Sequence, residues 1–371
     1  MNNFYQKYLL PGLVFQGVVI GGGYATGREL VEFFLPYGPV SGLLAMGAAA
    51  LIWSLVMAVS FELCRMSRSY DYKSFFLQLL GRFWFLYEFL LLALMIVVLS
   101  VIGAAAGEIV QNLFSIPALA GTALLLFVVG GLTFFGSQLI ERFMGGWSLL
   151  LYLCYFSLVI LCFMTFGDAI KASYSAATLT SGWAIGGLQY AGYNLATVPA
   201  VFFCLTHLTK RREALTSGML AGGIGMLPAV FLFVAMMGHY PDIGSEAIPS
   251  TWLLSQIGLP WFSVIFQVVL LGTFVQTGVG LIHSINERIA ATLESQGRKM
   301  PRPARPAVAL VLLITAVFLA NRFGLVALIA NGYGILTFGF LAVFVVPVLC
   351  IGTYKILWPT APGARADIQG P

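Results

Sequence analysis

Charged side chains follow a run of glycines inside the first apolar stretch of the chain. Each glycine costs a helix interior about 1 kcal/mol relative to alanine, so three in succession predict an interrupted helix. If this stretch lies in a membrane, the freed backbone groups must line a cavity or bind a ligand. The alternative is close helix packing through small residues. We predict substrate contacts at four residues, Gly21, Gly22, Gly23 and Tyr24.

Three ionisable residues, Arg28, Glu29 and Glu32, lie shortly beyond these glycines. Ionisable groups within membrane helices are costly and usually face a bundle interior or a watery cavity. We predict that Arg28 closes the outer side of a pocket by pairing with a carboxylate, either Glu29 or Glu108. The competing interpretation is an arginine–glutamate pair at the membrane interface with no functional role.

A second apolar stretch repeats the pattern further along the chain. Gly192, Tyr193 and Asn194 precede Pro199, and glycine and proline are residues that stop and restart a helix. We predict a second interrupted helix here, with the first three of these residues as substrate contacts. The predicted substrate site is completed by two residues of another apolar stretch, Ser100 and Gly103.

No catalytic or cofactor-binding motif accompanies these residues. The sequence contains no His/Cys/Asp cluster with metal-ligand spacing, no G-x-S-x-G, and no Walker or dinucleotide glycine motif. We therefore expect neither an enzyme nor a protein with a bound cofactor or metal. The missing nucleotide motif also argues against primary pumping by this chain.

The composition is that of an integral membrane protein. Of the 371 residues, 60% are hydrophobic and 9% are charged, whereas soluble domains have about 45–50% and about 25%. So few charged residues cannot cover a water-soluble core, and the surface must face lipid. The net charge of +5 comes from scattered residues, without the basic stripe that a nucleic-acid partner requires. The five cysteines lack paired spacing, which argues against a disulfide framework.

The elements that position the candidate residues are predicted to be ten membrane-spanning helices. A span needs about 20 predominantly apolar residues, and the sequence lacks the short alternating segments of a barrel. The fold class is therefore all-α. The predicted spans are residues 10–35, 39–63, 83–112, 118–136, 143–166, 184–206, 215–238, 258–286, 307–321 and 325–353.

The distribution of positive charge predicts the orientation of these spans. With the N-terminus in the cytoplasm, the inner loops and termini contain 16 of the 19 lysines and arginines. The outer loops contain Lys171 and Arg322. Because cytoplasmic loops are enriched in positive residues, both termini are predicted to be cytoplasmic, including a tail over residues 354–371.

The two predicted interruptions fall in spans one and six, which are the first spans of two five-helix halves. Because each half contains an odd number of spans, the two halves lie in opposite orientations in the membrane. This is the inverted-repeat plan of many secondary transporters, whose binding site lies between the two broken helices. We predict one transmembrane domain made of two repeats, residues 10–173 and 184–353.

Three segments resemble the YkvI-type family of bacterial membrane proteins, within the amino acid–polyamine–organocation superfamily. They are residues 20–34 (IGGGYATGRELVEFF), 190–196 (YAGYNLA) and 277–281 (TGVGL). The first segment is the most specific, and the similarity extends over nearly the whole chain. The resemblance implies the LeuT fold, a transport function and a location in the bacterial inner membrane, without naming a substrate.

The resemblance also implies a cation site on the eighth span. Thr273 and Thr277 share one helix face, their hydroxyls suit Na⁺, and Gln276 is the third candidate ligand. Many Na⁺-binding relatives have two adjacent hydroxyl residues here, whereas Gln276 precedes Thr277 in this chain. A threonine hydroxyl can instead bond back to its own helix.

We favour Na⁺ as the coupling ion because residues 145–167 contain no lysine that could replace it. The alternative is H⁺, carried by Glu29, Glu32 or Glu108.

The sequence therefore predicts a secondary transporter, a symporter or exchanger, that moves a small polar solute by alternating access. An amino acid or related amine is the expected solute. The alternative is a nutrient-sensing receptor that uses the same pocket without turnover. The predicted partners are the solute and the lipid bilayer.

Overall fold

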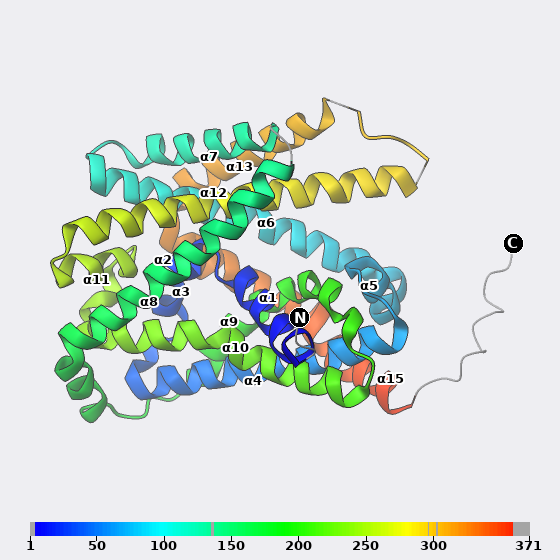
Figure 1. Cartoon of the computed structure of the whole chain (residues 1–371), viewed down its shortest axis with the longest axis horizontal. Helices are drawn as coiled ribbons and strands as arrows, with labels where there is room; N and C mark the ends of the chain where they lie inside the picture. Colours follow the sequence, from blue (N-terminus) through cyan, green and yellow to red (C-terminus); the bar gives the residue numbers. More distant parts are fainter. Residues whose placement is uncertain (1–3, 135–136, 296, 302, 359–371) are drawn as a thin grey trace, which may run out of the picture.

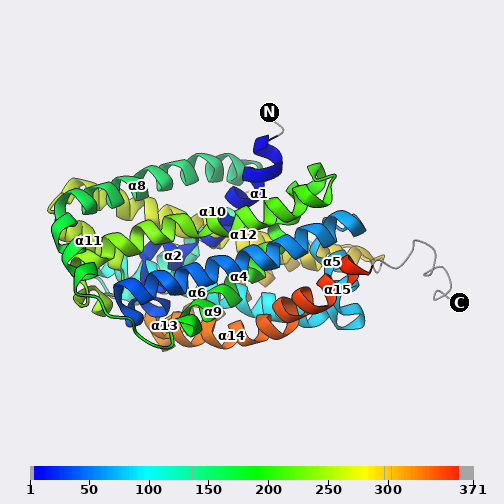
Figure 2. The ribbon, with the colours of Figure 1, turned by 90° about the horizontal axis from the view of Figure 1, so that it is seen from below.

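The computed structural model describes residues 4–134, 137–295, 297–301 and 303–358. Within these residues the regular structure is helical, with no strand. Most of the long helices run along the longest axis of the molecule (Figures 1 and 2). The all-α prediction is therefore confirmed for this part of the chain.

The first half of the chain begins with a helix in several pieces. A π-helical turn, η1 (Tyr5–Leu9), continues into α1 (Leu10–Val19), which is followed by two short helices, α2 (Gly22–Thr26) and α3 (Arg28–Phe33). The remaining elements of this half are η2 (Leu35–Tyr37), α4 (Gly38–Ser67), α5 (Tyr72–Leu80), η3 (Gly81–Phe83), α6 (Trp84–Phe114), α7 (Ala118–Phe134) and α8 (Ser137–Ser175).

The second half begins with α9 (Trp183–Asn194), which continues directly into a 3₁₀ helix, η4 (Leu195–His207). A loop with three short helices separates the next two long helices. The remaining elements are α10 (Arg211–Met236), η5 (Met237–His239), η6 (Asp242–Ser245), α11 (Pro249–Ile257), α12 (Pro260–Ser295), α13 (Ala304–Ala327), η7 (Leu328–Tyr333), α14 (Gly334–Phe340), η8 (Leu341–Val345), η9 (Val348–Gly352) and α15 (Thr353–Leu357).

Six helical segments of the described chain are long and apolar enough to cross a membrane. This supports an integral membrane protein, because such a segment needs about 20 apolar residues. Three of the segments have 40 residues or more, about twice the length that one crossing requires. The six are Arg28–Ser67, Tyr72–Phe114, Leu149–Ser175, Arg211–His239, Pro260–Glu294 and Ala304–Leu357.

Glycines bring the helices around the centre into close contact. A Cβ at Gly218 of α10 would lie 2.3 Å from the backbone nitrogen of Ala58 in α4. A Cβ at Gly187 of α9 would lie 2.4 Å from the carbonyl oxygen of Ala45, also in α4. Small residues at helix interfaces are the usual means of close packing in membranes. These contacts fix α9 and α10 on α4 beside the broken first helix.

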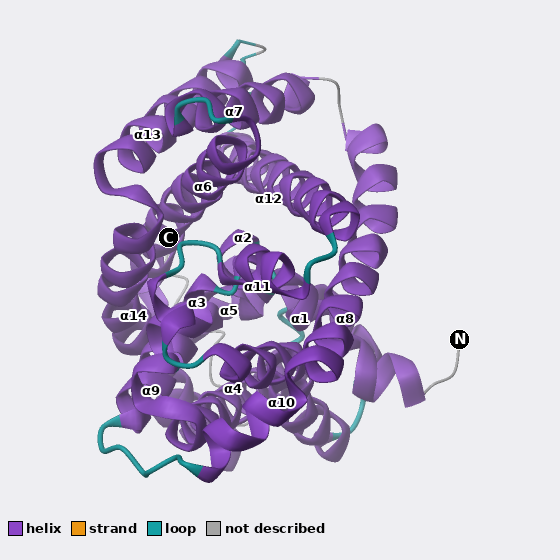
Figure 3. Cartoon of the chain, turned by 90° about the vertical axis from the view of Figure 1, so that its left-hand side faces the viewer, coloured by secondary structure: helices purple, strands orange, loops and turns teal. Residues whose placement is uncertain are grey.

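The broken first helix lies inside the bundle. Seen from one end, α2 and α3 are surrounded by longer helices, with α6 and α12 on one side and α4 and α10 on the other (Figure 3). α2 packs against α6, α12 and α11, while α3 packs against α9 and η7. The residues that follow the glycine run are therefore held at the centre of the molecule.

The sixth predicted span differs from the prediction. Asn194 and Leu195 have helical backbone angles, so α9 is not interrupted but narrows into the 3₁₀ helix η4. Gly192 serves close packing instead, since a Cβ there would lie 2.6 Å from Thr337 Cγ2 of α14. Pro199 lies within η4. The prediction of an interrupted sixth helix is wrong, although a 3₁₀ stretch of this length is itself unusual.

The predicted C-terminal tail is described in part. α15 occupies Thr353–Leu357, and residues 359–371 lie outside the described residues.

Candidate functional site

The first helix is interrupted at the predicted place. α1 ends at Val19, and the chain leaves the helical conformation at Ile20 (ψ 68°) and Gly21 (φ −95°, ψ −165°). After α2 the chain turns again at Gly27, where φ is +80°. This left-handed conformation favours glycine, and a Cβ would also lie 3.3 Å from Pro249 Cβ in α11. The first span therefore leaves the helical conformation twice, at Ile20–Gly21 where the glycine run begins and again at Gly27.

Thr26 holds the short α2 helix together between these turns. Its hydroxyl donates to the carbonyl oxygen of Gly23 at 2.6 Å and accepts a hydrogen bond from the backbone N–H of Arg28 at 3.2 Å. Thr26 is fully buried, so no water competes for these bonds. The position of the charged residues that follow is thus defined by a local hydrogen-bond pattern.

Glu29 turns its carboxylate into the protein. The residue is 4% exposed, and Tyr193 Oη donates a hydrogen bond of 2.6 Å to Glu29 Oε2. The other carboxylate oxygen lies against Gly23, where a Cβ would be 2.2 Å from Oε1. Among the described residues, Glu29 forms no ion pair within 4.0 Å. A buried carboxylate without a cation is energetically costly and points to function.

Five tyrosines surround this carboxylate and interact with it electrostatically. They come from the first helix and from α8, α9 and η7. We call them, together with Glu29, the tyrosine–glutamate cluster; the tyrosines are Tyr24, Tyr155, Tyr190, Tyr193 and Tyr333.

Three hydroxyls of the tyrosine–glutamate cluster have no hydrogen-bond partner among the described residues. They belong to Tyr24, Tyr155 and Tyr190, and all three are buried. The rings of Tyr193 and Tyr333 stack with their centroids 4.4 Å apart, and those of Tyr24 and Tyr155 lie 6.3 Å apart. Buried polar atoms in proteins are normally paired. Three unpaired hydroxyls around one carboxylate therefore mark a site that can bind a polar ligand.

Arg28 points away from this cluster, toward the loop before α11. Its guanidinium Nη1 donates to the carbonyl oxygens of Gly244 and Glu246, both at 3.0 Å, and Nη2 lies 3.3 Å from Glu32 Oε2. The carboxylate partner of Arg28 is thus Glu32, not Glu29 or Glu108. The residue is 7% exposed. Arg28 therefore ties the broken helix to the loop that precedes α11.

The other predicted substrate contacts lie outside the tyrosine–glutamate cluster. Ser100 Oγ donates to the carbonyl of Ile96 in its own helix. Gly103 faces α7, because its carbonyl accepts a hydrogen bond from Thr122 and a Cβ would contact the same side chain. Asn194 Nδ2 donates to the carbonyl of Tyr190 within α9.

The predicted cation ligands lie on α12, which packs against α2. Thr273 is buried, and its hydroxyl donates to the carbonyl of Val269 one turn earlier at 2.9 Å. This is the backbone bond that competes with a ligand role, although the hydroxyl oxygen keeps a lone pair for a cation. Gln276 and Thr277 are half-buried on the same helix.

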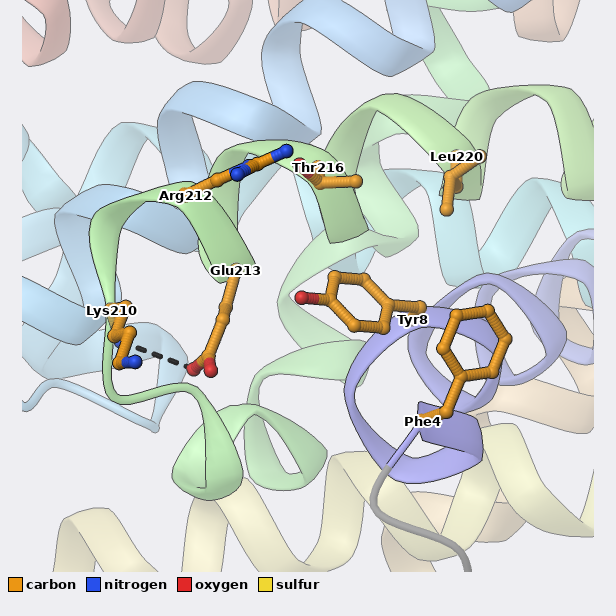
Figure 4. A pocket seen from close by; sticks show the side chains of 7 residues that line it. All are labelled: Phe4, Tyr8, Lys210, Arg212, Glu213, Thr216 and Leu220. Atoms are coloured by element: carbon orange, nitrogen blue, oxygen red, sulfur yellow. Dashed lines mark hydrogen bonds between the residues drawn. The ribbon is translucent and has the colours of Figure 1, made fainter.

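A surface pocket at the N-terminal segment is a separate feature. It has a volume of about 410 Å³ and is lined by Phe4 and Tyr8 of the N-terminal segment and by the start of α10 (Figure 4). Glu213 stands at this pocket, accepts a hydrogen bond from the Lys210 N–H, and pairs with Lys7 Nζ at 2.8 Å. These residues do not belong to the tyrosine–glutamate cluster. Their contacts fasten the N-terminal segment to α10.

Similarity to known proteins agrees with this arrangement. The chain is 23% identical over 345 residues to the uncharacterized membrane protein YkvI of Bacillus subtilis (strain 168), which covers 91% of this chain and 94% of that protein. The chain is a homologue of YkvI. No family model matches it.

The chain also resembles solved structures in its fold. MhsT, solved in complex with L-phenylalanine, has a TM-score of 0.57 at 15% identity, covering 94% of this chain and 97% of that one. The Eremococcus coleocola manganese transporter, solved with an aromatic bis-isothiourea substituted compound, has a TM-score of 0.52 at 17% identity, covering 92% and 78%. The predicted resemblance to YkvI is therefore confirmed, and the fold is LeuT-like.

Three tyrosines of the cluster were not found by sequence reasoning. Tyr155, Tyr190 and Tyr333 lie in apolar stretches, where an aromatic residue usually indicates packing. A tyrosine in the middle of a predicted span is the signal that would have identified them, because its hydroxyl needs a partner there.

Proposed function

We propose that this protein is a secondary transporter that carries a small polar solute across the bacterial inner membrane by alternating access. The observation that carries the proposal is the tyrosine–glutamate cluster, a buried carboxylate with three unpaired hydroxyls beside the break in the first helix. Broken helices of this kind form the binding sites of many secondary transporters. The LeuT-like fold supports the same conclusion.

The transmembrane domain is proposed to have ten spans in two inverted repeats. Ala304–Leu357 contains 54 residues, or about 80 Å of helix at 1.5 Å per residue, against about 30 Å of hydrocarbon. Gly324 has φ +72° and interrupts this segment near its middle, which provides a turn between two spans. The repeats, residues 10–173 and 184–353, then each begin with an irregular helix.

The contacts of Arg28 support its role as part of the outer gate. The guanidinium binds the loop before α11, and α11 itself packs against α2. A connection between the broken helix and a loop above the site closes one access route while it is intact. Opening that route requires these hydrogen bonds to break.

Counterflow into proteoliposomes tests the proposal. We choose three amino acids and the amines that remain when the carboxylate is removed: phenylalanine and phenylethylamine, valine and isobutylamine, lysine and cadaverine. Liposomes containing the protein and loaded with one unlabelled compound are expected to accumulate its labelled form above protein-free liposomes. Ligand binding without counterflow for any of the six would instead support the sensing receptor.

Orientation is tested with introduced cysteines. Both termini are proposed to be cytoplasmic because of the charge bias in the loops. Cys350 is the exposed native cysteine and is replaced by serine, since the other four are buried. A cysteine at exposed Ser245 is expected to react with an impermeant maleimide in intact cells, and one at exposed Lys299 only after permeabilisation. The reverse labelling pattern would overturn the orientation.

The coupling ion is proposed to be Na⁺, bound by Thr273, Gln276 and Thr277. These residues lie on the helix that packs against the break, and hydroxyl and carbonyl oxygens suit a hard cation. Replacing Na⁺ by K⁺ at constant pH is expected to weaken solute binding in the wild type, and Thr273→Ala and Thr277→Ala are expected to lose this dependence. Solute binding that does not depend on Na⁺ but changes with pH would instead favour a carboxylate as a proton carrier, with Glu29, Glu32 and Glu108 as the candidates.

A further inference from the structure

The tyrosine–glutamate cluster has one formal charge and no compensating cation. Glu29 is buried and forms no ion pair among the described residues. The neighbouring arginine cannot compensate it, because the Arg28 guanidinium is engaged by two carbonyl oxygens and by Glu32. An uncompensated charge in a low-dielectric site is costly. A proton or a positively charged ligand can compensate this carboxylate, and the surrounding groups are suited to the second.

The remaining groups of the cluster suit an ammonium ion. Each unpaired hydroxyl of Tyr24, Tyr155 and Tyr190 can accept one N–H. The tyrosine rings also offer their faces, and aromatic faces attract organic cations, as in the cages that bind quaternary amines. A carboxylate, several hydroxyl acceptors and aromatic walls together recognise an amine more completely than they recognise an inorganic ion.

The same cluster disfavours a ligand carboxylate. Among the described residues, no lysine, arginine or histidine lies within ion-pair distance of Glu29. An α-carboxylate beside the ligand nitrogen would lie close to Glu29, and like charges repel strongly when they are desolvated. We propose that the tyrosine–glutamate cluster binds the ammonium group of an organic amine that carries no carboxylate beside its nitrogen. This inference rests on the proposed transport function and specifies its substrate class.

The test compares the three amino acid–amine pairs by thermal unfolding of the purified full-length protein. A ligand that binds the folded state raises its melting temperature. We expect at least one of phenylethylamine, isobutylamine and cadaverine to raise the melting temperature, and the matched amino acid to raise it less. This comparison uses the wild type and does not depend on the folding of any variant.

Glu29→Gln removes the charge and retains the shape. Its amide oxygen can still accept the hydrogen bond from Tyr193, so the fold is expected to persist. Loss of one partner of a buried charge pair should weaken amine affinity roughly 30-fold or more. The matched control is Asp168→Asn, which removes a carboxylate that is fully exposed at the end of α8 and should leave amine affinity unchanged.

Three results would overturn the inference: amino acids that stabilise as well as their amines, no stabilisation by any amine, or an unchanged amine response in Glu29→Gln. Counterflow distinguishes this failure from failure of the proposed function. Exchange of amino acids without binding of amines would support the proposed transport function and contradict the proposed amine specificity. Amine binding without exchange would retain the amine site in a protein that is not a carrier.

Discussion

Gly23→Ala is expected to weaken solute binding strongly while the protein remains folded. The added Cβ would lie 2.2 Å from Glu29 Oε1 and 3.0 Å from Glu29 Cδ, so the carboxylate must leave its position. The hydrogen bond from Tyr193 would then break, and a hydrogen bond to a charged group contributes about 1.5–3 kcal/mol. Binding measured by ligand-dependent melting should fall by the corresponding factor, about 10- to 150-fold.

Gly47→Ala is the matched control for this substitution. Gly47 lies in α4, and a Cβ there would have no neighbour within 4 Å. Alanine is the better helix former by about 1 kcal/mol, so binding should be unchanged and stability equal or higher. Wild-type solute binding in Gly23→Ala would show that binding does not require the Glu29 carboxylate at its observed position.

Arg28→Ala is expected to reduce exchange of solute strongly. The substitution removes the two hydrogen bonds to the carbonyls of Gly244 and Glu246 and leaves the Glu32 carboxylate without its partner. The broken helix then loses its connection to the loop before α11, and the outer route no longer closes. Counterflow should drop by about tenfold or more, as expected when one partner of a largely buried charge pair is removed.

Arg28→Lys separates charge from geometry. Lysine keeps the positive charge but lacks the planar fork that binds two carbonyls and a carboxylate together, so intermediate counterflow is expected. Arg322→Ala removes an exposed arginine of α13 and serves as the control. Wild-type exchange in both Arg28 variants would mean that this arginine has only a structural role.

The membrane class, the helical fold and the break in the first helix were predictable because they depend on local properties. Apolar runs of sufficient length must be helical in lipid, where each backbone group needs an internal partner. Three consecutive glycines weaken a helix wherever they occur, and the structure has its non-helical residues at Ile20, Gly21 and Gly27.

The sixth helix shows where local reasoning failed. The segment that contains Gly186, Gly187 and Gly192 has the composition of a helix-breaking segment. A Cβ added at any of these glycines, however, would lie within 2.6 Å of an atom of a neighbouring segment. At these glycines α9 packs closely against α3, α4 and α14, and it remains helical. A glycine that breaks a helix and a glycine that admits a neighbour are identical in sequence.

The partners of the charged residues were decided by tertiary structure. The sequence by itself determined that Arg28, Glu29 and Glu32 lie on one short helical stretch after a break, and that such charges need partners inside a membrane. Which partner each one finds depends on residues more than a hundred positions away: Arg28 reaches the carbonyls at 244 and 246, and Glu29 reaches Tyr193. Helix periodicity gives the direction of a side chain around the axis of its helix. The packing of α8, α9 and η7 around the first helix is what brings the tyrosines to the Glu29 carboxylate.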